Sequence, residues 1–373
     1  MSQENAKRVA FEACRDYSDS LEDALHRLLA PLGGMAAFVQ PGQSVLIKPN
    51  MLTDRAPDEA VTTHPEVVRA IVRAVRDCGG NPSVADSPAS AAKLEQVWEK
   101  TGFRAMCEAE GVPLLNLERA GSLPFTVDGI SFHVAKPVLE ANVLISVPKV
   151  KTHTLTTLTA AVKNLYGTLP GYQKAQLHMA FPSPSEFGRM LRAISSKVRP
   201  ALHIADGIIG MEGEGPAAGR PVALGFLAAA TDAESLDLAL CRLLGVSPAA
   251  VPYLDAAHFC ETPLPPGFPE PLRFRVPSTL GARLIPAPLV RLLGRLIWIR
   301  PGISEKACIQ CGRCVKACPV KALALESGWA APRLTPSKCI GCCCCHEICP
   351  EKAISMMQSP VVRLLRRGKS LSD

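Results

Sequence analysis

The chain has 373 residues, of which 47% are hydrophobic and 20% charged, and its formal net charge is +7. This length excludes one small domain and suits a sizeable α/β core with an appended module. No apolar run is long enough to cross a bilayer and the first residues lack a secretory signal, so we expect a cytoplasmic protein.

Apolar, β-branched segments alternate with helical patterns between residues 40 and 260. A helix is predicted within 62–80, where Thr63 and Glu66 match a capping box and two glycines supply a stop. Another is predicted from Asp232 to Leu244. Strands are predicted at 44–50, 82–88, 141–153, 201–207 and 222–232. The alternation predicts an α/β fold with a largely parallel, helix-covered sheet.

Polar residues follow the predicted strands at their carboxyl ends, where ligands bind in open α/β sheets. They are Lys48, Asn50, Asp86, Ser87, Lys149, Lys151, His153, Asp206 and Asp232. An aspartate in such a place is by itself more often a helix cap or a turn residue. The agreement of five strand ends nevertheless favours one ligand-binding crevice.

Two further segments have the composition of site loops. Residues 162–178 place Lys163, Asn164, Lys174 and His178 among turn-forming glycines. Residues 206–219 are rich in glycine but match neither a Walker nor a Rossmann fingerprint, and Glu212 and Glu214 would repel phosphate.

The residue types suggest roles in the predicted crevice. Lys149, Lys151 and Lys163 are candidates for binding an anion. The carboxylates suit a cation, a metal or acid–base chemistry; they are Asp206, Glu212, Glu214 and Asp232. Three histidines are candidates for proton transfer or metal binding, although a lone histidine is more often structural: His64, His153 and His178.

Several stretches taken together resemble the domain of unknown function 362 family. They are "VLIKPN", "TTHPEVV", "DSP", "PKVKTHTLTTLTAAVKNLYGTLPG" and "DGIIGMEGEGP", and they cover about residues 40–260. The resemblance implies no particular reaction. It implies that a ferredoxin module at the C-terminus is common, and a distant similarity to the nickel-pincer lactate racemase fold hints, by analogy only, at metal or cofactor chemistry.

The segment after this core predicts a joint between two parts. Residues 261–271 hold five prolines in eleven positions and predict a stiff, extended linker. Residues 287–301 predict a short, basic amphipathic helix. Packing of this helix between the two parts is favoured over the alternative of lying on a membrane surface.

Ten of the fifteen cysteines fall between Cys308 and Cys349, a density that indicates metal binding rather than disulfides. "CIQCGRCVKACP" starts at Cys308 and "CIGCCCCHEICP" starts at Cys339, so the pattern C-x2-C-x2-C-x3-C-P occurs twice with a 31-residue spacing. This pattern resembles bacterial two-cluster ferredoxins. A zinc ribbon is the alternative, but it uses two C-x2-C pairs instead.

In the ferredoxin pattern the fourth cysteine of each motif reaches the other cluster. We therefore expect two [4Fe–4S] clusters with crossed ligands. One would be bound by Cys308, Cys311, Cys314 and Cys349, and the other by Cys339, Cys342, Cys345 and Cys318. Cys343 and Cys344 stand where the first motif has Gly312 and Arg313. They are either spare thiols or substitutes for a neighbouring ligand.

These observations predict an α/β domain at 1–260 with its family core at about 40–260, and a linker and amphipathic helix at 261–303. They also predict a small α+β two-cluster ferredoxin domain at 304–358, followed by a basic tail at 359–373.

The preferred function is that of an iron–sulfur redox protein. Its two [4Fe–4S] clusters would be coupled to a small anionic substrate or cofactor, which would make the protein an oxidoreductase. It would exchange electrons with a redox partner protein. One alternative is an electron carrier whose large domain is a docking scaffold. Another is a non-redox binding protein with structural clusters. Nucleic acid is not expected, since aromatic residues make up 5% of the chain and no nucleic-acid motif is found.

Overall fold

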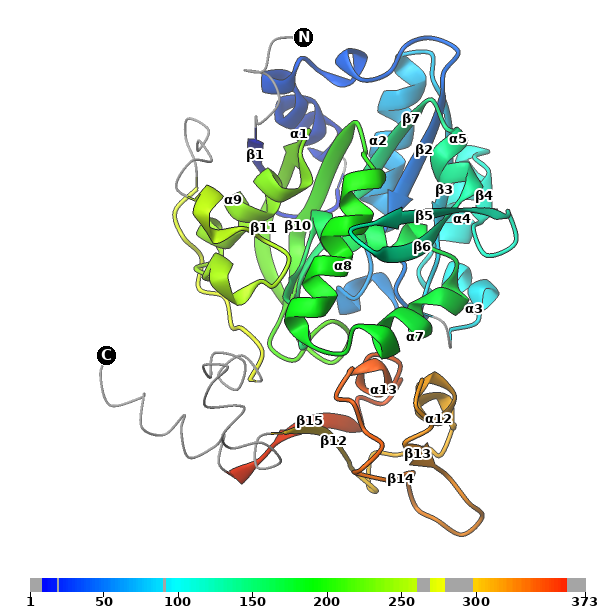
Figure 1. Ribbon diagram of the computed structural model, residues 1–373. Helices are drawn as coiled ribbons and strands as arrows, with labels where there is room; N and C mark the ends of the chain where they lie inside the picture. Colours follow the sequence, from blue (N-terminus) through cyan, green and yellow to red (C-terminus); the bar gives the residue numbers. More distant parts are fainter. Residues whose placement is uncertain (1–8, 19, 90–91, 260–268, 279–297, 361–373) are drawn as a thin grey trace.

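The structure is a computed structural model that describes residues 9–18, 20–89, 92–259, 269–278 and 298–360. Figure 1 shows a large α/β domain with a small cysteine-rich domain, here called the cysteine domain (residues 299–358), at one end of it. The helices of the cysteine domain are directed toward the α/β domain. None of the helices in the described ranges is long and apolar enough to cross a membrane.

The α/β domain is built on a nine-stranded sheet within the described residues, with the core order β1-β11-β10-β7-β2-β3-β4. β7 pairs in parallel with β10 and β2, and β3 continues the parallel part to β4. The strands are β1 (Val9–Ala13), β2 (Ser44–Pro49), β3 (Asn81–Asp86), β4 (Leu114–Asn116), β7 (Val143–Val147), β8 (Lys149–His153), β9 (Thr157–Thr159), β10 (Leu202–Glu212) and β11 (Arg220–Ala230). The predicted α/β class with a largely parallel sheet is confirmed.

Helices cover both faces of this sheet (Figure 1). On one face lie α1 (Ser20–Leu29), α2 (Pro65–Asp77), α3 (Leu94–Lys100) and α4 (Phe103–Glu110). On the other lie α6 (Ala161–Asn164), α8 (Pro184–Lys197) and α9 (Ala233–Leu243). The hairpin β5 (Ser122–Val127) and β6 (Ile130–Ala135), with α5 (Lys136–Glu140) and α7 (Gly171–Ala180), completes the domain.

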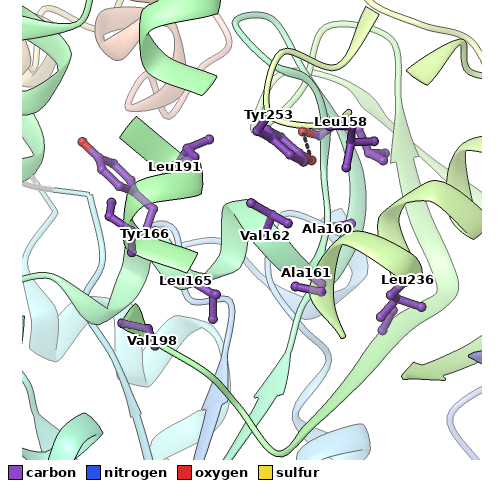
Figure 2. Packing of buried hydrophobic residues seen from close by; sticks show 14 of the residues in the cluster. Leu158, Ala160, Ala161, Val162, Leu165, Tyr166, Leu191, Val198, Leu236 and Tyr253 are labelled. Carbon is purple, nitrogen blue, oxygen red and sulfur yellow. Dashed lines mark hydrogen bonds between the residues drawn. The ribbon is translucent and has the colours of Figure 1, made fainter. Parts of the chain in front are cut away.

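Alternation along β2 divides its side chains between the two helix layers. Val45 and Ile47 pack in the layer of α2, and Leu46 packs in the layer of α8. Lys48 is two residues beyond Leu46, so it lies on the α8 side of the sheet. Figure 2 shows the packing in that layer, where the Tyr253 hydroxyl donates to the Leu158 carbonyl at 3.1 Å.

The strand predicted at 141–153 is wrong as a single element. The chain breaks at Pro148 into β7 and β8, both of which pair in parallel with β10. Proline has no N–H to continue a ladder, and the Pro148 carbonyl instead accepts from the Asp206 N–H at 2.9 Å. The break brings the Lys149–His153 segment over the end of the sheet.

The predicted capping box at Thr63 is also wrong. His64 is the N-cap of α2, and its Nδ1 accepts from the Glu66 N–H at 3.3 Å. The Thr63 hydroxyl instead accepts from the Asn50 N–H at 2.9 Å and donates to the Val147 carbonyl at 2.7 Å. This hydroxyl connects the ends of β2 and β7 by hydrogen bonds. Such a tertiary contact cannot be recognised from a local capping pattern.

The cysteine domain contains two short antiparallel pairs and two short helices. β12 (Ile299–Ile303) pairs with β15 (Ile354–Gln358), and β13 (Leu323–Ala324) pairs with β14 (Arg333–Leu334). The helices are α12 (Arg313–Ala317) and α13 (Cys344–Glu347).

Strand β12 begins five residues before the predicted domain boundary at 304 and includes the last residues of the helix predicted at 287–301. Residues 287–297 of that helix, most of the linker 261–271 and most of the tail 359–373 lie outside the described residues.

Candidate functional site

The cysteines of the two motifs surround two separate cavities. Cys308, Cys311, Cys314 and Cys349 line one of about 350 Å³. Cys318, Cys339, Cys342 and Cys345 line another of about 330 Å³, together with Cys343. Each cavity therefore collects three cysteines of one motif and the fourth cysteine of the other, the same grouping that the sequence predicts.

The backbone repeats with the sequence. Left-handed conformations occur at Gln310, Gly312 and Lys321 in the first motif, with φ of 56°, 70° and 51°. They recur 31 residues later at Gly341, Cys343 and Lys352, with φ of 68°, 67° and 50°. Cys343 thus adopts a conformation that glycine has in the first motif, and which costs a side-chain-bearing residue free energy.

The cysteine surroundings fit iron–sulfur clusters. Backbone N–H groups of Gln310, Ala322 and Ala353 donate to the sulfurs of Cys308, Cys318 and Cys349 at 3.4, 3.1 and 3.3 Å. Such donors tune clusters held by thiolates. In the described ranges no three His, Cys, Asp or Glu side chains are arranged to hold a single metal ion, and the sulfurs stand instead in two groups of four around the two cavities.

Specific polar contacts dock the cysteine domain onto the α/β domain. Arg313 Nη1 contacts both carboxylate oxygens of Asp54, at 2.8 and 3.0 Å. Arg55 donates to the Cys349 carbonyl at 2.7 Å. His346 Nε2 lies 3.0 Å from the carbonyl of Glu214. These contacts bring both cysteine motifs against the carboxyl ends of the parallel strands.

A third cavity, here called the interdomain cavity, lies between the two domains and measures about 750 Å³ when its part open to solvent is counted. The α/β domain contributes most of its wall, including Lys48, Asn50, Asp86, Ser87, Lys151, His153, Thr159, Lys163, Asn164, Tyr166, Gly167, Lys174 and His178. The cysteine domain contributes Ala317, Cys344, Glu347 and Ile348. The sequence did not single out Thr159, Tyr166 and Glu347, because each is an ordinary residue until the fold brings it to this wall.

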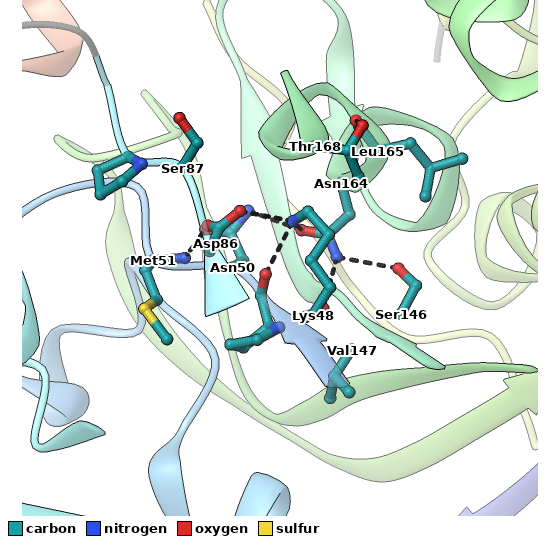
Figure 3. Close-up of polar contacts among 12 residues, drawn as sticks. Lys48, Asn50, Met51, Asp86, Ser87, Ser146, Val147, Asn164, Leu165 and Thr168 are labelled. Atoms are coloured by element: carbon teal, nitrogen blue, oxygen red, sulfur yellow. Dashed lines mark hydrogen bonds and ion pairs between the residues drawn. The ribbon is translucent and has the colours of Figure 1, made fainter. Parts of the chain in front are cut away.

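A buried polar network closes the sheet side of the cavity (Figure 3). Lys48 Nζ lies 2.7 Å from Asp86 Oδ1, and also donates to Asn164 Oδ1 at 3.2 Å. Asp86 Oδ2 accepts from the Met51 N–H at 2.7 Å. Asn164 in turn donates to the Ser146 hydroxyl at 3.0 Å. Since these groups satisfy one another, they act as a rigid support rather than as free ligands.

Three other lysines give the cavity a surplus of positive charge. Burial lowers the pKa of Lys151 and of Lys174 to about 7. Burial also lowers the pKa of Lys163, whose ammonium lies over the ring faces of Tyr166 and Phe187, 4.6 and 5.4 Å from their centroids. An anion that replaces lost hydration would stabilise the charged form of all three.

Four buried polar atoms of the cavity wall have no hydrogen-bond partner among the described residues. Asp86 Oδ1 and Glu347 Oε1 each lie within ion-pair distance of a basic side chain, whereas Nδ1 of His178 and Oγ1 of Thr159 do not. Both side chains are buried, with exposures of 5% and 3%. Burial lowers the pKa of His178 to about 3, so its imidazole is neutral at physiological pH. His153 of the α/β domain lies with its Nε2 3.4 Å from Oε1 of Glu347 in the cysteine domain, so this contact links the two domains.

Lys149 and Asp206 do not line the interdomain cavity. They form a buried ion pair in which Nζ and Oδ2 are 2.8 Å apart. The Tyr17 hydroxyl donates to Asp206 Oδ1 at 3.0 Å, and the Tyr17 ring stacks on His64 with centroids 3.7 Å apart. Three predicted site residues, Lys149, His64 and Asp206, are therefore placed in a separate, mutually satisfied network.

The expected gathering of five strand ends in one crevice is wrong for Asp232. β11 runs antiparallel to β10, so its carboxyl end lies at the opposite edge of the sheet. There Asp232 caps α9 by accepting from the Ser235 N–H at 2.7 Å. Glu212 and Glu214 are also outside the interdomain cavity: Glu212 forms an ion pair with Arg220, and Glu214 accepts from the Ser278 N–H at 2.7 Å.

Comparison with known proteins gives two family matches. The model described as domain of unknown function (DUF362) matches residues 45–242, and a 4Fe-4S dicluster domain matches residues 300–350. The chain is also 40% identical to a thylakoid-associated protein of Synechocystis over 255 residues, which is 67% of this chain and 78% of that protein.

Solved structures show weaker likenesses. The lactate racemase apoprotein of Thermoanaerobacterium thermosaccharolyticum is 15% identical with a TM-score of 0.42, over 65% of this chain and 58% of that one. A Thermotoga maritima protein is 16% identical with a TM-score of 0.34, over 58% and 56%. The chain thus spans less than two thirds of either solved protein, and neither likeness carries a functional argument. Its core and its cysteine motifs identify the chain as a member of the DUF362 family with a C-terminal 4Fe–4S dicluster domain, and hence as an iron–sulfur protein.

Proposed function

We propose that this protein is an electron-transfer protein in which two [4Fe–4S] clusters serve redox chemistry on a small anionic substrate or cofactor in the interdomain cavity. One observation carries the proposal. The wall of that cavity combines the lysine-rich end of the α/β domain with Cys344 and Glu347 of α13, a helix that also contains Cys345. A molecule in the cavity therefore sits beside the second cysteine motif.

The proposed ligands follow the two cysteine cavities. Cys308, Cys311, Cys314 and Cys349 hold the first cluster, and Cys318, Cys339, Cys342 and Cys345 hold the second. When bound, such clusters supply storage and transfer of single electrons. All other contributions come from side chains of the cavity wall.

Those side chains bind and orient the small molecule. Lys163 holds its anionic group, and Lys151 and Lys174 add positive charge behind it. The neutral imidazole of His178 offers Nδ1 as a hydrogen-bond partner. His153 is held against Glu347 and keeps the two walls together.

We further propose that the protein works in the cytoplasm and exchanges electrons with a redox partner protein. Ile309, whose side chain is 60% exposed, and the exposed Cys311 border the first cysteine cavity and give a partner access to it. The Synechocystis relative is named as thylakoid-associated, so fractionation of cells should test both the soluble and the membrane-bound pools for this partner.

An EPR-monitored reductive titration of anaerobically purified protein tests the proposal. Two spin-coupled [4Fe–4S]⁺ centres that reduce reversibly at low potential are expected. Clusters that cannot be reduced reversibly would mean a structural role and would overturn the electron-transfer proposal. If reduction is reversible but Lys163→Met and His178→Ala leave small-anion binding and the reduction potentials unchanged, the protein is an electron carrier with a docking scaffold.

A further inference from the structure

We propose that Cys344 is the residue through which the cysteine domain contacts the small molecule in the interdomain cavity, and that it is not a cluster ligand. This inference rests on the proposed function, since it needs a molecule in that cavity. It assigns a role to one of the two cysteines that fall outside the ferredoxin pattern. It also defines which end of the molecule faces the cysteine domain.

The internal repeat of the cysteine domain supports the orientation of Cys344. It aligns with Arg313, and each is the first residue of its helix, after a left-handed residue with φ of 67° or 70°. Arg313 reaches out of the cysteine domain to Asp54 of the α/β domain, 2.8 Å away. The equivalent position in both motifs therefore faces the α/β domain, and in the second motif the residue there is a thiol.

The structure separates the two off-pattern cysteines. Cys343 lines the second cysteine cavity, together with Cys342 and Cys345. Cys344 does not line that cavity and lines the interdomain cavity instead. Its Sγ lies 4.0 Å from the Cys342 carbonyl and is hydrogen-bonded to the Cys342 thiol, so the Cys344 thiol stands between the second motif and the interdomain cavity.

Independent observations show that the interdomain cavity is built for a ligand. Nδ1 of His178 and Oγ1 of Thr159 are buried without a partner among the residues described, and both side chains line the cavity. Polar atoms buried in folded proteins nearly always have a partner. Lys163 lies above aromatic rings and none of the described residues accepts a hydrogen bond from it. A bound molecule would complete all three.

The two walls define the chemical class of the molecule. The α/β wall offers Lys151, Lys163 and Lys174, which suit an oxyanion such as a carboxylate or phosphate group. The cysteine-domain wall offers the apolar side chains of Ala317 and Ile348 beside the thiol, and its carboxyl group, Glu347, is held 3.4 Å from His153. The molecule thus has an oxyanion at Lys163 and an uncharged, less polar end against Cys344 and Ile348.

The test uses full-length, anaerobically purified protein with its clusters in place. Wild-type protein is treated with iodoacetamide in three buffers of equal ionic strength, which contain acetate, inorganic phosphate or chloride. Labelled cysteines are then identified by peptide mass spectrometry. We expect labelling of Cys344 in chloride and at least fivefold slower labelling with acetate, with phosphate or with both. Lys163→Met should abolish this protection, and labelling of Cys78, which is remote and partly exposed, should not respond.

Iron, sulfide and EPR measurements on two variants complete the test. Cys344→Ala should retain the iron content and EPR spectrum of the wild type, whereas Cys342→Ser should lose about half of the iron, as expected for one of two clusters. Loss of iron from Cys344→Ala would make it a ligand and overturn the inference. Absence of labelling in chloride, or labelling that ignores both anions, would also overturn it. Either result leaves the electron-transfer proposal standing, because that proposal fails only if the wild-type clusters do not reduce reversibly.

Discussion

Arg313 of the first cysteine motif binds both carboxylate oxygens of Asp54, through Nη1 at distances of 2.8 and 3.0 Å. The Asp54 side chain is only 5% exposed, so the contact is shielded from water. Arg55, the next residue, donates to the Cys349 carbonyl at 2.7 Å. Adjacent residues of one loop thus hold the beginning of α12 and the last cysteine of the second motif.

Substitution of Arg313 by methionine should therefore loosen the docking of the cysteine domain. The buried Asp54 carboxylate would keep the Thr53 hydroxyl at 3.0 Å and the more distant Lys100 at 3.5 Å, and losing a charged hydrogen-bond partner typically costs about 1–3 kcal/mol. Hydrogen exchange should become faster at residues 50–60 and 344–350 together. Arg333→Met is the matched control, because Arg333 contacts Trp329 within the cysteine domain. Equal exchange in both variants would show that the ion pair does not hold the domains together.

Gly167→Ala should destabilise the support of the interdomain cavity. A Cβ at this position would overlap Asp86 Oδ1 and would lie 2.7 Å from Lys48 Nζ, so the buried ion pair must move. Overpacking of this kind costs about 1–3 kcal/mol. The midpoint of thermal unfolding should fall by several degrees. Gly34→Ala, where a Cβ meets nothing within 4 Å at φ +73°, is the control for backbone strain alone. A smaller fall for Gly167→Ala than for Gly34→Ala would contradict this account.

Anion binding should weaken as the pH rises through about 7. Burial lowers the pKa of Lys174 to about 7, although Asp86 opposes this effect and Glu118, Lys48 and Lys163 also face the group. Loss of its proton above that pH removes positive charge from the cavity, so the Kd for acetate should increase by roughly tenfold per pH unit for one coupled proton. Calorimetry at pH 6, 7 and 8 measures this slope. Lys174→Met should make the slope shallower and leave the part due to Lys151, whose pKa burial also lowers to about 7. An equally steep slope in that variant would assign the proton to another group.

The same lysines should give the stability of the unliganded protein the opposite dependence on pH. The unfolded chain has lysine pKa values near 10.4, roughly three units above the value of about 7 in the folded protein for Lys151 and Lys174. Between these values the unfolded chain binds more protons, so the free energy of unfolding should rise from pH 7 toward pH 10. Chemical denaturation across this range checks the sign, and a smaller rise is expected in Lys151→Met. A fall with pH in the wild type and no change in the variant would show that these lysines are not titrating.

Crossed ligation makes a specific prediction for Cys349. Although Cys349 belongs to the second motif, it lines the cavity of Cys308, Cys311 and Cys314. Cys349→Ser should therefore lower iron from about eight to about four atoms per chain. The EPR spectrum of the remaining cluster should match that of Cys311→Ser. A match to Cys342→Ser instead would mean that each motif binds its own cluster.

The sequence by itself determined the features that depend on local spacing. The repeated cysteine pattern predicts two four-cysteine groups with an exchanged fourth member, and the folded chain collects the same groups around two cavities. The period of the apolar residues predicts the helix-covered sheet, because each strand or helix must bury a face of its own. The sequence placed Lys48, Asp86, Lys151, Lys163, Lys174 and His178 at strand ends or in the segment 162–178, and all six line the interdomain cavity. The segment predicted as a site loop is helical at Lys163, Lys174 and His178.

Tertiary structure alone decided which polar residues meet. Asp206 and Asp232 were both predicted to follow strands, yet Asp206 lies within β10, and the antiparallel direction of β11 places Asp232 at the opposite end of the sheet. Lys149 and Lys151 are two residues apart, but Lys149 pairs with Asp206 and only Lys151 reaches the interdomain cavity. Cys343 and Cys344 are neighbours with identical chemistry, and the left-handed turn at Cys343 directs them into different cavities. Strand direction and side-chain direction depend on pairing with distant segments, and that information is not contained in any local pattern.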